Sequence, residues 1–260
     1  MRLSDIPRIT FWPYDLFGYM LPGATFLTGI ALGNSRASTF LMSLWSSDKP
    51  ANYILLAFLA YMAGNCISAI SSLVIEAHLL QWTFKYPSAR LFPSKKESAR
   101  SLWGHVRHWI GWLGKRIAPN YCNAFPEDFQ KSVRDTFKQV FDTDFASSRD
   151  RFWSTWSFIS LHHPAAYRRG SHFVELYGFS RNTCMSFILI AALPIFSLPP
   201  FETWTPPTDL RNWVWPSLIA ALFFFANYLK LIKRMDDEMY HAFIVAAKAP
   251  IAGDAEDDGA

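Results

Sequence analysis

Two arginine–histidine pairs come closest to a catalytic pattern in this chain. They are Arg100 with His105 in RSLWGH, and Arg234 with His241 in RMDDEMYH. An arginine that binds a scissile phosphate and a histidine that transfers protons would together suit the cleavage of RNA. The seven histidines, the permitted spacings and the arginine frequency predict about one such pair by chance. We therefore keep RNA cleavage only as an alternative.

A metal site built from histidine and cysteine is the second candidate. Its ligands would come from His105, His108, Cys122, His162 and His163. An HxxH pair with a separate HH pair lacks the ligand spacing of known zinc sites. The sequence also has no glycine-rich phosphate loop and no GxSxG nucleophile motif. We expect no metal and no cofactor.

Small and polar residues inside apolar stretches are the third candidate. Gly64 and Ser68 lie four residues apart beside Asn65, which is typical of close contact between membrane helices. We predict a helix-contact face at these three residues instead of an ion path. Glu76 lies near the end of the same stretch, where we expect an interhelical or capping role.

Charge is scarce along four stretches, which are 14–33, 53–74, 183–198 and 213–229. Only 18% of all residues are charged, against about 25% in soluble domains. A membrane span needs about 20 mainly apolar residues, and the preceding VELYGFS lengthens the third stretch to that size. We predict an all-α membrane protein with four transmembrane helices and a helical cytosolic insert between helices 2 and 3.

The first stretch contains Pro22 and Gly23 within YDLFGYMLPGATFLTGIALG. No small-residue cleavage site follows it, so we interpret it as a span and not as a cleaved signal peptide. Transmembrane helices tolerate proline and glycine when neighbouring groups satisfy the freed backbone. We predict a packed kink at these two residues, with a hinge as the alternative.

Basic residues predict the orientation of the four spans. All but three of the 25 lysines and arginines, Arg36, Lys49 and Arg211, fall on the side of the termini and the insert. Cytosolic flanks carry the excess of basic residues, so both termini should be cytosolic. Asp15, Arg181 and Asn182 lie at span ends and are predicted interface anchors. Arg181 would reach headgroup depth, and Asn182 would bond to a neighbouring helix.

Four regions follow from these patterns. Residues 1–80 hold transmembrane helices 1 and 2, and 81–180 form a cytosolic helical domain. Residues 181–247 hold helices 3 and 4 with a cytosolic extension, and 248–260 form a disordered acidic tail. Within the insert, 126–141 should pack as a core helix. The basic, tryptophan-rich helix at 101–117 would lie either on the membrane or in the domain core.

The segments YDLFGYMLPG, AYMAGNCISAISSL and ELYGFSRNTCMSFILIAAL occur in that order. They resemble uncharacterised bacterial inner-membrane proteins with four spans, some of which are found near antiviral defence genes. The most specific residues of the resemblance are Asp15, Gly18, Pro22, Gly23, Gly64, Arg181 and Asn182. Asn65 stands where we associate a histidine with that group, which argues against a titrating role. The resemblance implies an architecture and a bacterial inner-membrane location, and no established activity.

The function expected from these observations is that of a non-enzymatic, oligomeric membrane component. Its cytosolic domain would receive a protein partner or signal, and its helices would scaffold or perturb the lipid bilayer, in bacterial defence if the resemblance holds. We expect no nucleic-acid partner. The alternatives are a membrane-tethered HEPN-like ribonuclease and a small channel or transporter subunit.

Overall fold

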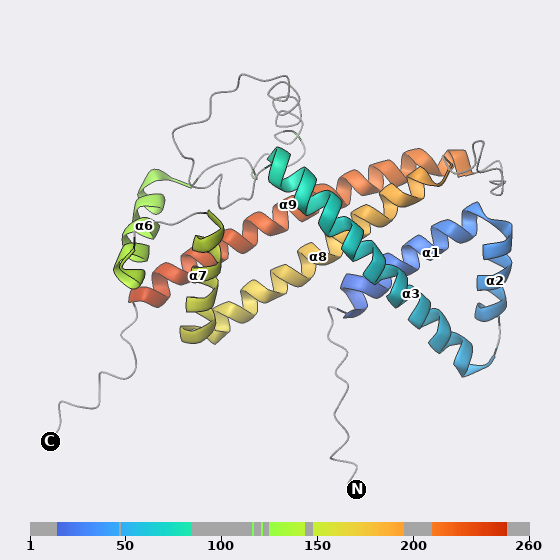
Figure 1. Ribbon diagram of the computed structural model, residues 1–260, viewed down its shortest axis with the longest axis horizontal. Coiled ribbons are helices and arrows are strands. Elements are labelled where there is room, and N and C mark those ends of the chain that lie inside the picture. The colour runs from blue at the N-terminus through green and yellow to red at the C-terminus, as the bar shows by residue number, and fades with distance from the viewer. Residues whose placement is uncertain are drawn as a thin grey trace, which may run out of the picture. The chain divides into compact units, whose positions relative to one another are not determined.

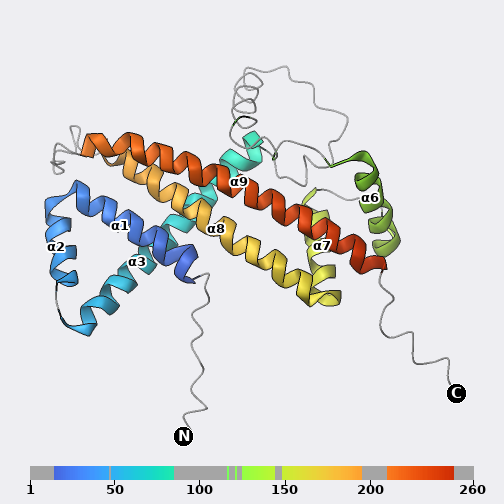
Figure 2. The same cartoon turned by 180° about the vertical axis from the view of Figure 1, so that it is seen from behind.

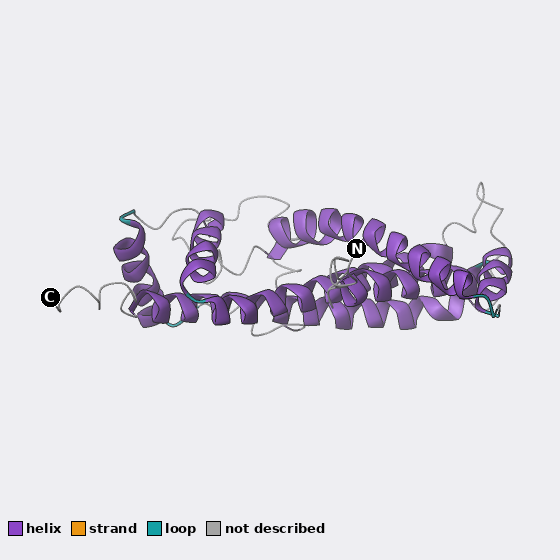
Figure 3. Cartoon of the chain, turned by 90° about the horizontal axis from the view of Figure 1, so that it is seen from below, coloured by secondary structure: helices purple, strands orange, loops and turns teal. Residues whose placement is uncertain are grey.

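The computed structural model describes residues 15–46, 48–84, 116, 121, 125–143, 148–194 and 210–248. Figure 1 shows their order, and Figure 3 shows that no described residue lies in a strand, so the all-α prediction is confirmed. The elements are η2 (Asp15–Met20), α1 (Leu21–Gly33), α2 (Ser35–Trp45), α3 (Pro50–Ser71), η3 (Ser72–Phe84), α6 (Glu127–Phe141), α7 (Ser148–His162), α8 (Pro164–Ala192) and α9 (Leu210–Lys248). Most of the predicted helix at 101–117 and nearly all of the predicted tail lie outside the described residues.

Three helical segments are long and apolar enough to cross a bilayer. They are Leu16–Gly33, Pro50–Leu80 and Asn212–Lys248, and they contain most of the first, second and fourth predicted stretches. Residues 183–192 of the third predicted stretch form the end of α8, which does not meet the same criterion within the described residues. Arg181 and Asn182 lie just before its short apolar run, so they lower the mean hydropathy of any span-length window that includes them.

The chain divides into two compact units, which we call unit 1 and unit 2. Unit 1 comprises Met1–Ala77 with Glu175–Tyr228, and unit 2 comprises His78–Val174 with Leu229–Ala260. Helices α8 and α9 therefore each supply residues to both units. The sequence prediction kept 181–247 together as one region, whereas the unit boundary falls within α9, after Tyr228.

In unit 1, the second half of α8 lies against the first half of α9 (Figures 1 and 2). Phe224 of α9 packs between two α8 rings, at centroid distances of 5.9 Å from both Phe179 and Phe187. The amide of Asn227 donates a hydrogen bond of 2.8 Å to Ser180. Aromatic packing and one polar contact thus hold these two helices together.

Unit 2 is built around the amphipathic helix α6. This helix follows Pro126, carries Glu127 and Asp128 in its first turn, and ends at Asp142 with a left-handed φ of 48°. Acidic residues suit a helix N-terminus because they complement its dipole. Val133 and Phe137 of α6 lie in two separate hydrophobic clusters, and each cluster is buried against α9. Ile159 of α7 belongs to the cluster that contains Phe137. The predicted core helix at 126–141 is therefore confirmed.

Polar side chains are also buried in unit 2. Arg151 of α7 and Asp236 and Tyr240 of α9 are buried. Removal from water lowers the pKa of the Arg151 guanidinium from its ordinary value, and Tyr240 opposes part of this change. Arginine stays protonated in proteins, so unit 2 keeps a buried positive charge.

Candidate functional site

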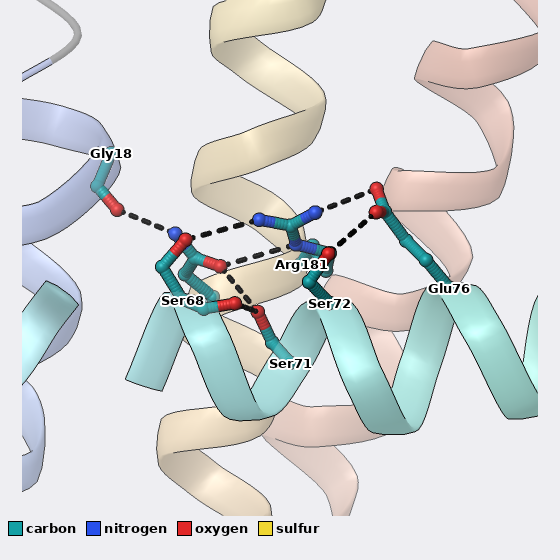
Figure 4. Close-up of polar contacts among 7 residues, drawn as sticks. Gly18, Ser68, Ser71, Ser72, Glu76 and Arg181 are labelled. Atoms are coloured by element: carbon teal, nitrogen blue, oxygen red, sulfur yellow. Dashed lines mark hydrogen bonds and ion pairs between the residues drawn. The ribbon is translucent and has the colours of Figure 1, made fainter. Parts of the chain in front are cut away.

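A buried polar cluster connects three separate parts of unit 1 (Figure 4). Its residues come from η2, from the end of α3 with the start of η3, and from α8. We define the polar cluster as Gly18, Ser68, Ser71, Ser72, Glu76, Arg181 and Asn182.

Arg181 contacts three cluster residues through three different nitrogens. Its Nη1 forms an ion pair of 2.6 Å with Oε1 of Glu76. Its Nε and Nη2 each donate a hydrogen bond of 3.2 Å, to Oδ1 of Asn182 and to Oγ of Ser68. The planar guanidinium suits this task because its donors point in several fixed directions.

Glu76 completes the ion pair from the other side. Its second oxygen, Oε2, accepts a hydrogen bond of 2.9 Å from Ser72, one turn earlier. The Glu76 side chain is 22% exposed and that of Arg181 is 9% exposed. Each carboxylate oxygen thus has a donor, and the opposite charges neutralise each other, as a buried pair requires.

Asn182 lies at the centre of the cluster and is 0% exposed. Its Nδ2 donates a hydrogen bond of 2.8 Å to the carbonyl of Gly18 in η2. Its Oδ1 accepts a hydrogen bond of 2.6 Å from Ser71 of α3. Asn182 therefore joins α8 to two other helical segments at once.

Pro22 removes one backbone donor that the Gly18 carbonyl could otherwise use. In an α-helical pattern the Gly18 carbonyl would accept from the N–H of residue 22, and proline has none. Ser186, one turn after Asn182, donates a hydrogen bond of 2.9 Å to the carbonyl of Pro22 itself. Two side chains of α8 thus bind two backbone carbonyls around the change from η2 to α1.

Two glycines allow the first and second candidate spans to cross at backbone contact. A Cβ atom at Gly23 would overlap the carbonyl of Ala60, and one at Gly64 would overlap the carbonyl of Tyr19. Close approach of this kind is typical of small residues in membrane helices. Pro22 and Gly23, predicted as a kink or hinge, thus lie where the π-helix η2 changes to the α-helix α1. Gly23 also lies at the close contact between the two candidate spans.

The predicted contact face divides between two roles. Gly64 lies at the crossing, and Ser68 belongs to the polar cluster. The Asn65 amide instead donates to the carbonyl of Tyr61 in its own helix, at 2.9 Å. Asn65 is half-buried and is not part of the cluster.

The interface-anchor interpretation of Arg181 needs correction. Its side chain is buried within unit 1 and paired with Glu76, instead of reaching lipid headgroups. Asn182 is equally buried and bonds to neighbouring helices. Asp15 is the first residue of η2. The sequence pattern predicted an interhelical or capping role for Glu76 but gave no signal for its partner, and Gly18 and Ser186 had no predicted site role.

The structure describes one of the two arginine–histidine pairs. Arg234 and His241 are exposed on α9, and seven residues of helix separate them by about 10 Å along the axis. The His241 ring packs on Phe129, with centroids 4.4 Å apart. Arg100 and His105 lie outside the described residues.

Among the residues the structure describes, no three His, Cys, Asp or Glu side chains gather as a metal site would require. His162 hydrogen-bonds through Nδ1 to the carbonyl of Phe158, at 2.9 Å. His163 is half-buried between α7 and α8. The remaining candidate ligands His105, His108 and Cys122 lie outside the described ranges.

Comparison with known proteins adds no assignment. No protein-family model, no curated protein and no solved structure matches this chain.

Proposed function

We propose that this protein is a non-enzymatic, multi-pass membrane scaffold with four transmembrane segments. Three are the candidate spans, and the fourth is the second half of α8. In this proposal the polar cluster holds the spans in one arrangement, and the helices of unit 2 form a cytosolic domain that receives a protein partner or signal.

One observation carries the assignment of α8 to the membrane. Asn182 and Ser186 bond to the carbonyls of Gly18 and Pro22, which belong to the first candidate span. Asn182 also accepts from Ser71 of the second candidate span. A segment that bonds to two spans at the same level must lie at their depth. The apolar residues after Asn182 would then continue α8 into the bilayer.

The chemistry of the cluster favours a structural role over catalysis or conduction. Ionisable residues at membrane depth usually face the bundle interior and pair with one another. Here Glu76 is paired with Arg181, and Asn182 uses both ends of its amide. A group committed to such bonds is a poor proton carrier or nucleophile, and it can hold helices in register.

Self-association, a bacterial inner-membrane location and a link to defence form the outer part of the proposal. They are motivated by the resemblance noted above and by the exposed apolar side chains of the spans, such as Ile54, Phe58, Ile219 and Phe223. In a membrane these side chains contact lipid or a second copy of the chain.

Reporter fusions after residues 48, 120, 205 and 250 test the arrangement. Four spans with cytosolic termini should give outside, inside, outside and inside. If α8 does not cross, the fusions at 205 and 250 exchange their signals, while those at 48 and 120 stay the same. An outside signal at 120 would contradict both arrangements.

A further inference from the structure

Helix α2 lies between two candidate spans and has an exposed apolar surface of its own. Asn34 alone separates it from α1, and residues 46–49 connect it to α3 (Figure 1). Four extended residues reach about 14 Å at most. If α1 and α3 cross a membrane, the end of α1 and the start of α3 lie at the same leaflet. Helix α2 must therefore lie close to that leaflet.

The residues of α2 form two distinct faces. Ser35, Thr39 and Ser43 recur every four residues, which places them on one side of the helix with Arg36 beside them. On the other side, Leu44 is buried, and Ala37 and Leu41 are half-buried. The inner face thus packs within unit 1, and the outer face is polar.

Two large apolar side chains flank the inner face of α2. Phe40 is 53% exposed and Trp45 is 67% exposed, and at about 100° per residue they fall on opposite sides of Leu44. Met42, which is 64% exposed, instead falls beside Ser35 at the edge of the polar face. The ring of Trp45 also meets Tyr53 of α3 edge to face, at a centroid distance of 6.3 Å.

The hydroxyl groups at the edge of the polar face are bonded within the helix. Thr39 donates to the carbonyl of Ser35 at 2.9 Å, and Ser43 donates to that of Phe40 at 2.7 Å. A hydroxyl with such an internal acceptor has a smaller free-energy cost of transfer from water into a less polar environment. Arg36 and Lys49 are the basic residues of this connection, and long basic side chains reach outward from an interface.

We propose that α2 lies in the interface of the lipid leaflet opposite the cytosol, with Phe40 and Trp45 among the lipid chains and the Ser35 face toward water. The inference rests on the proposed membrane arrangement. A lipid surface fits because the apolar residues lie on two sides of α2, where a bilayer surrounds the helix and one protein partner would cover a single side. A tryptophan and a tyrosine in contact are also typical of the interfacial aromatic belt.

Fluorescent labelling of single cysteines in vesicles of phosphatidylcholine and phosphatidylglycerol tests the inference. Cys66→Ala and Cys122→Ala remove two native thiols, while Cys184 is 2% exposed and stays in place. An environment-sensitive dye is then attached at Trp45→Cys, at Phe40→Cys or at Thr39→Cys. The parent without an added cysteine gives the background, and Phe58→Cys within the second span is the membrane control.

The dye at positions 40 and 45 should show blue-shifted emission and lose intensity to a lipid with a shallow doxyl quencher. The dye at 39 should lose intensity to aqueous iodide, and the dye at 58 to a deep doxyl quencher. Iodide quenching at 40 and 45, with lipid quenching at 58, would overturn the inference and leave the membrane proposal standing. Protection at 40 and 45 from all quenchers would also overturn it, because protein would then cover them. Absence of lipid quenching at 58 would overturn the membrane proposal and the inference together.

Discussion

Asn182 donates its side-chain amide to the carbonyl of Gly18 at 2.8 Å, and this carbonyl is the one that Pro22 leaves without its α-helical donor. A break in the backbone pattern of the first span is therefore matched by a side chain of α8. The same amide accepts from Ser71 at 2.6 Å (Figure 4). The proline and the asparagine act as one unit, although 160 residues separate them.

Replacing Asn182 with leucine should destabilise the membrane bundle. The change leaves the Gly18 carbonyl and the Ser71 hydroxyl without Asn182, at a cost of about 1 to 3 kcal/mol in the free energy of unfolding. Asn65→Leu is the matched control, because the Asn65 amide donates to the carbonyl of Tyr61 in its own helix. Thermal unfolding in mild detergent should show a clear drop in Tm for Asn182→Leu and a smaller one for the control. Equal drops would contradict the bridging role.

Removing one partner of the Arg181–Glu76 pair should be more harmful than removing both. Arg181→Leu leaves the Glu76 carboxylate without its cation, and breaking a buried pair costs about 3 to 5 kcal/mol. In Arg181→Leu with Glu76→Leu no charge is left behind, so the amount of folded protein in the membrane should partly recover. A double variant no better than Arg181→Leu alone would show that the pair is not coupled.

Arg181→Lys should also impair assembly, in contrast to the mild effect expected of a headgroup anchor. A lysine can pair with Glu76, but it cannot at the same time contact Ser68 and Asn182 along fixed directions. The monodisperse fraction in size-exclusion chromatography measures the effect. A monodisperse fraction equal to that of the parent protein would support the interpretation of Arg181 as a headgroup anchor.

Gly64→Leu should separate the first two spans, because even a Cβ atom at this position would overlap the Tyr19 backbone. We expect loss of the compact monomer fold and of any cellular phenotype that expression produces, with the chain still in the membrane fraction. Ala69→Leu places the same leucine side chain on an exposed face of the same helix and should be tolerated. At Gly29 the atoms in the way belong to the Ile190 side chain, so Gly29→Ala should be milder than Gly64→Ala.

The ribonuclease alternative is tested by His105→Ala combined with His241→Ala. Under the scaffold proposal this variant keeps the phenotype of the parent, such as growth arrest, dye uptake or phage resistance. His241→Phe preserves a ring against Phe129 and controls for lost packing. If both the double variant and His241→Phe assemble normally but are inactive, and the purified parent cleaves RNA, the scaffold proposal is wrong.

Local patterns were sufficient for several of the helices, although α2 and α7 were not predicted as separate helices. The low charge of the chain and its apolar stretches predicted the three segments that are long and apolar enough to span a membrane. The 126–141 pattern predicted α6, because a face of Val133 and Phe137 after an acidic first turn is a property of neighbouring residues. Hydropathy and helical period depend on short windows of sequence, so they are readable without knowing the fold.

The tertiary structure decided what the polar residues do. From the sequence, Arg181 next to an apolar run is typical of an interface anchor, whereas packing places it beside Glu76, more than 100 residues earlier. Asn65 and Asn182 are alike in type and in apolar surroundings, yet one bonds to its own helix and the other to two neighbours. The difference arises because a buried polar group must find a partner, and which partner lies within reach depends on how distant segments pack.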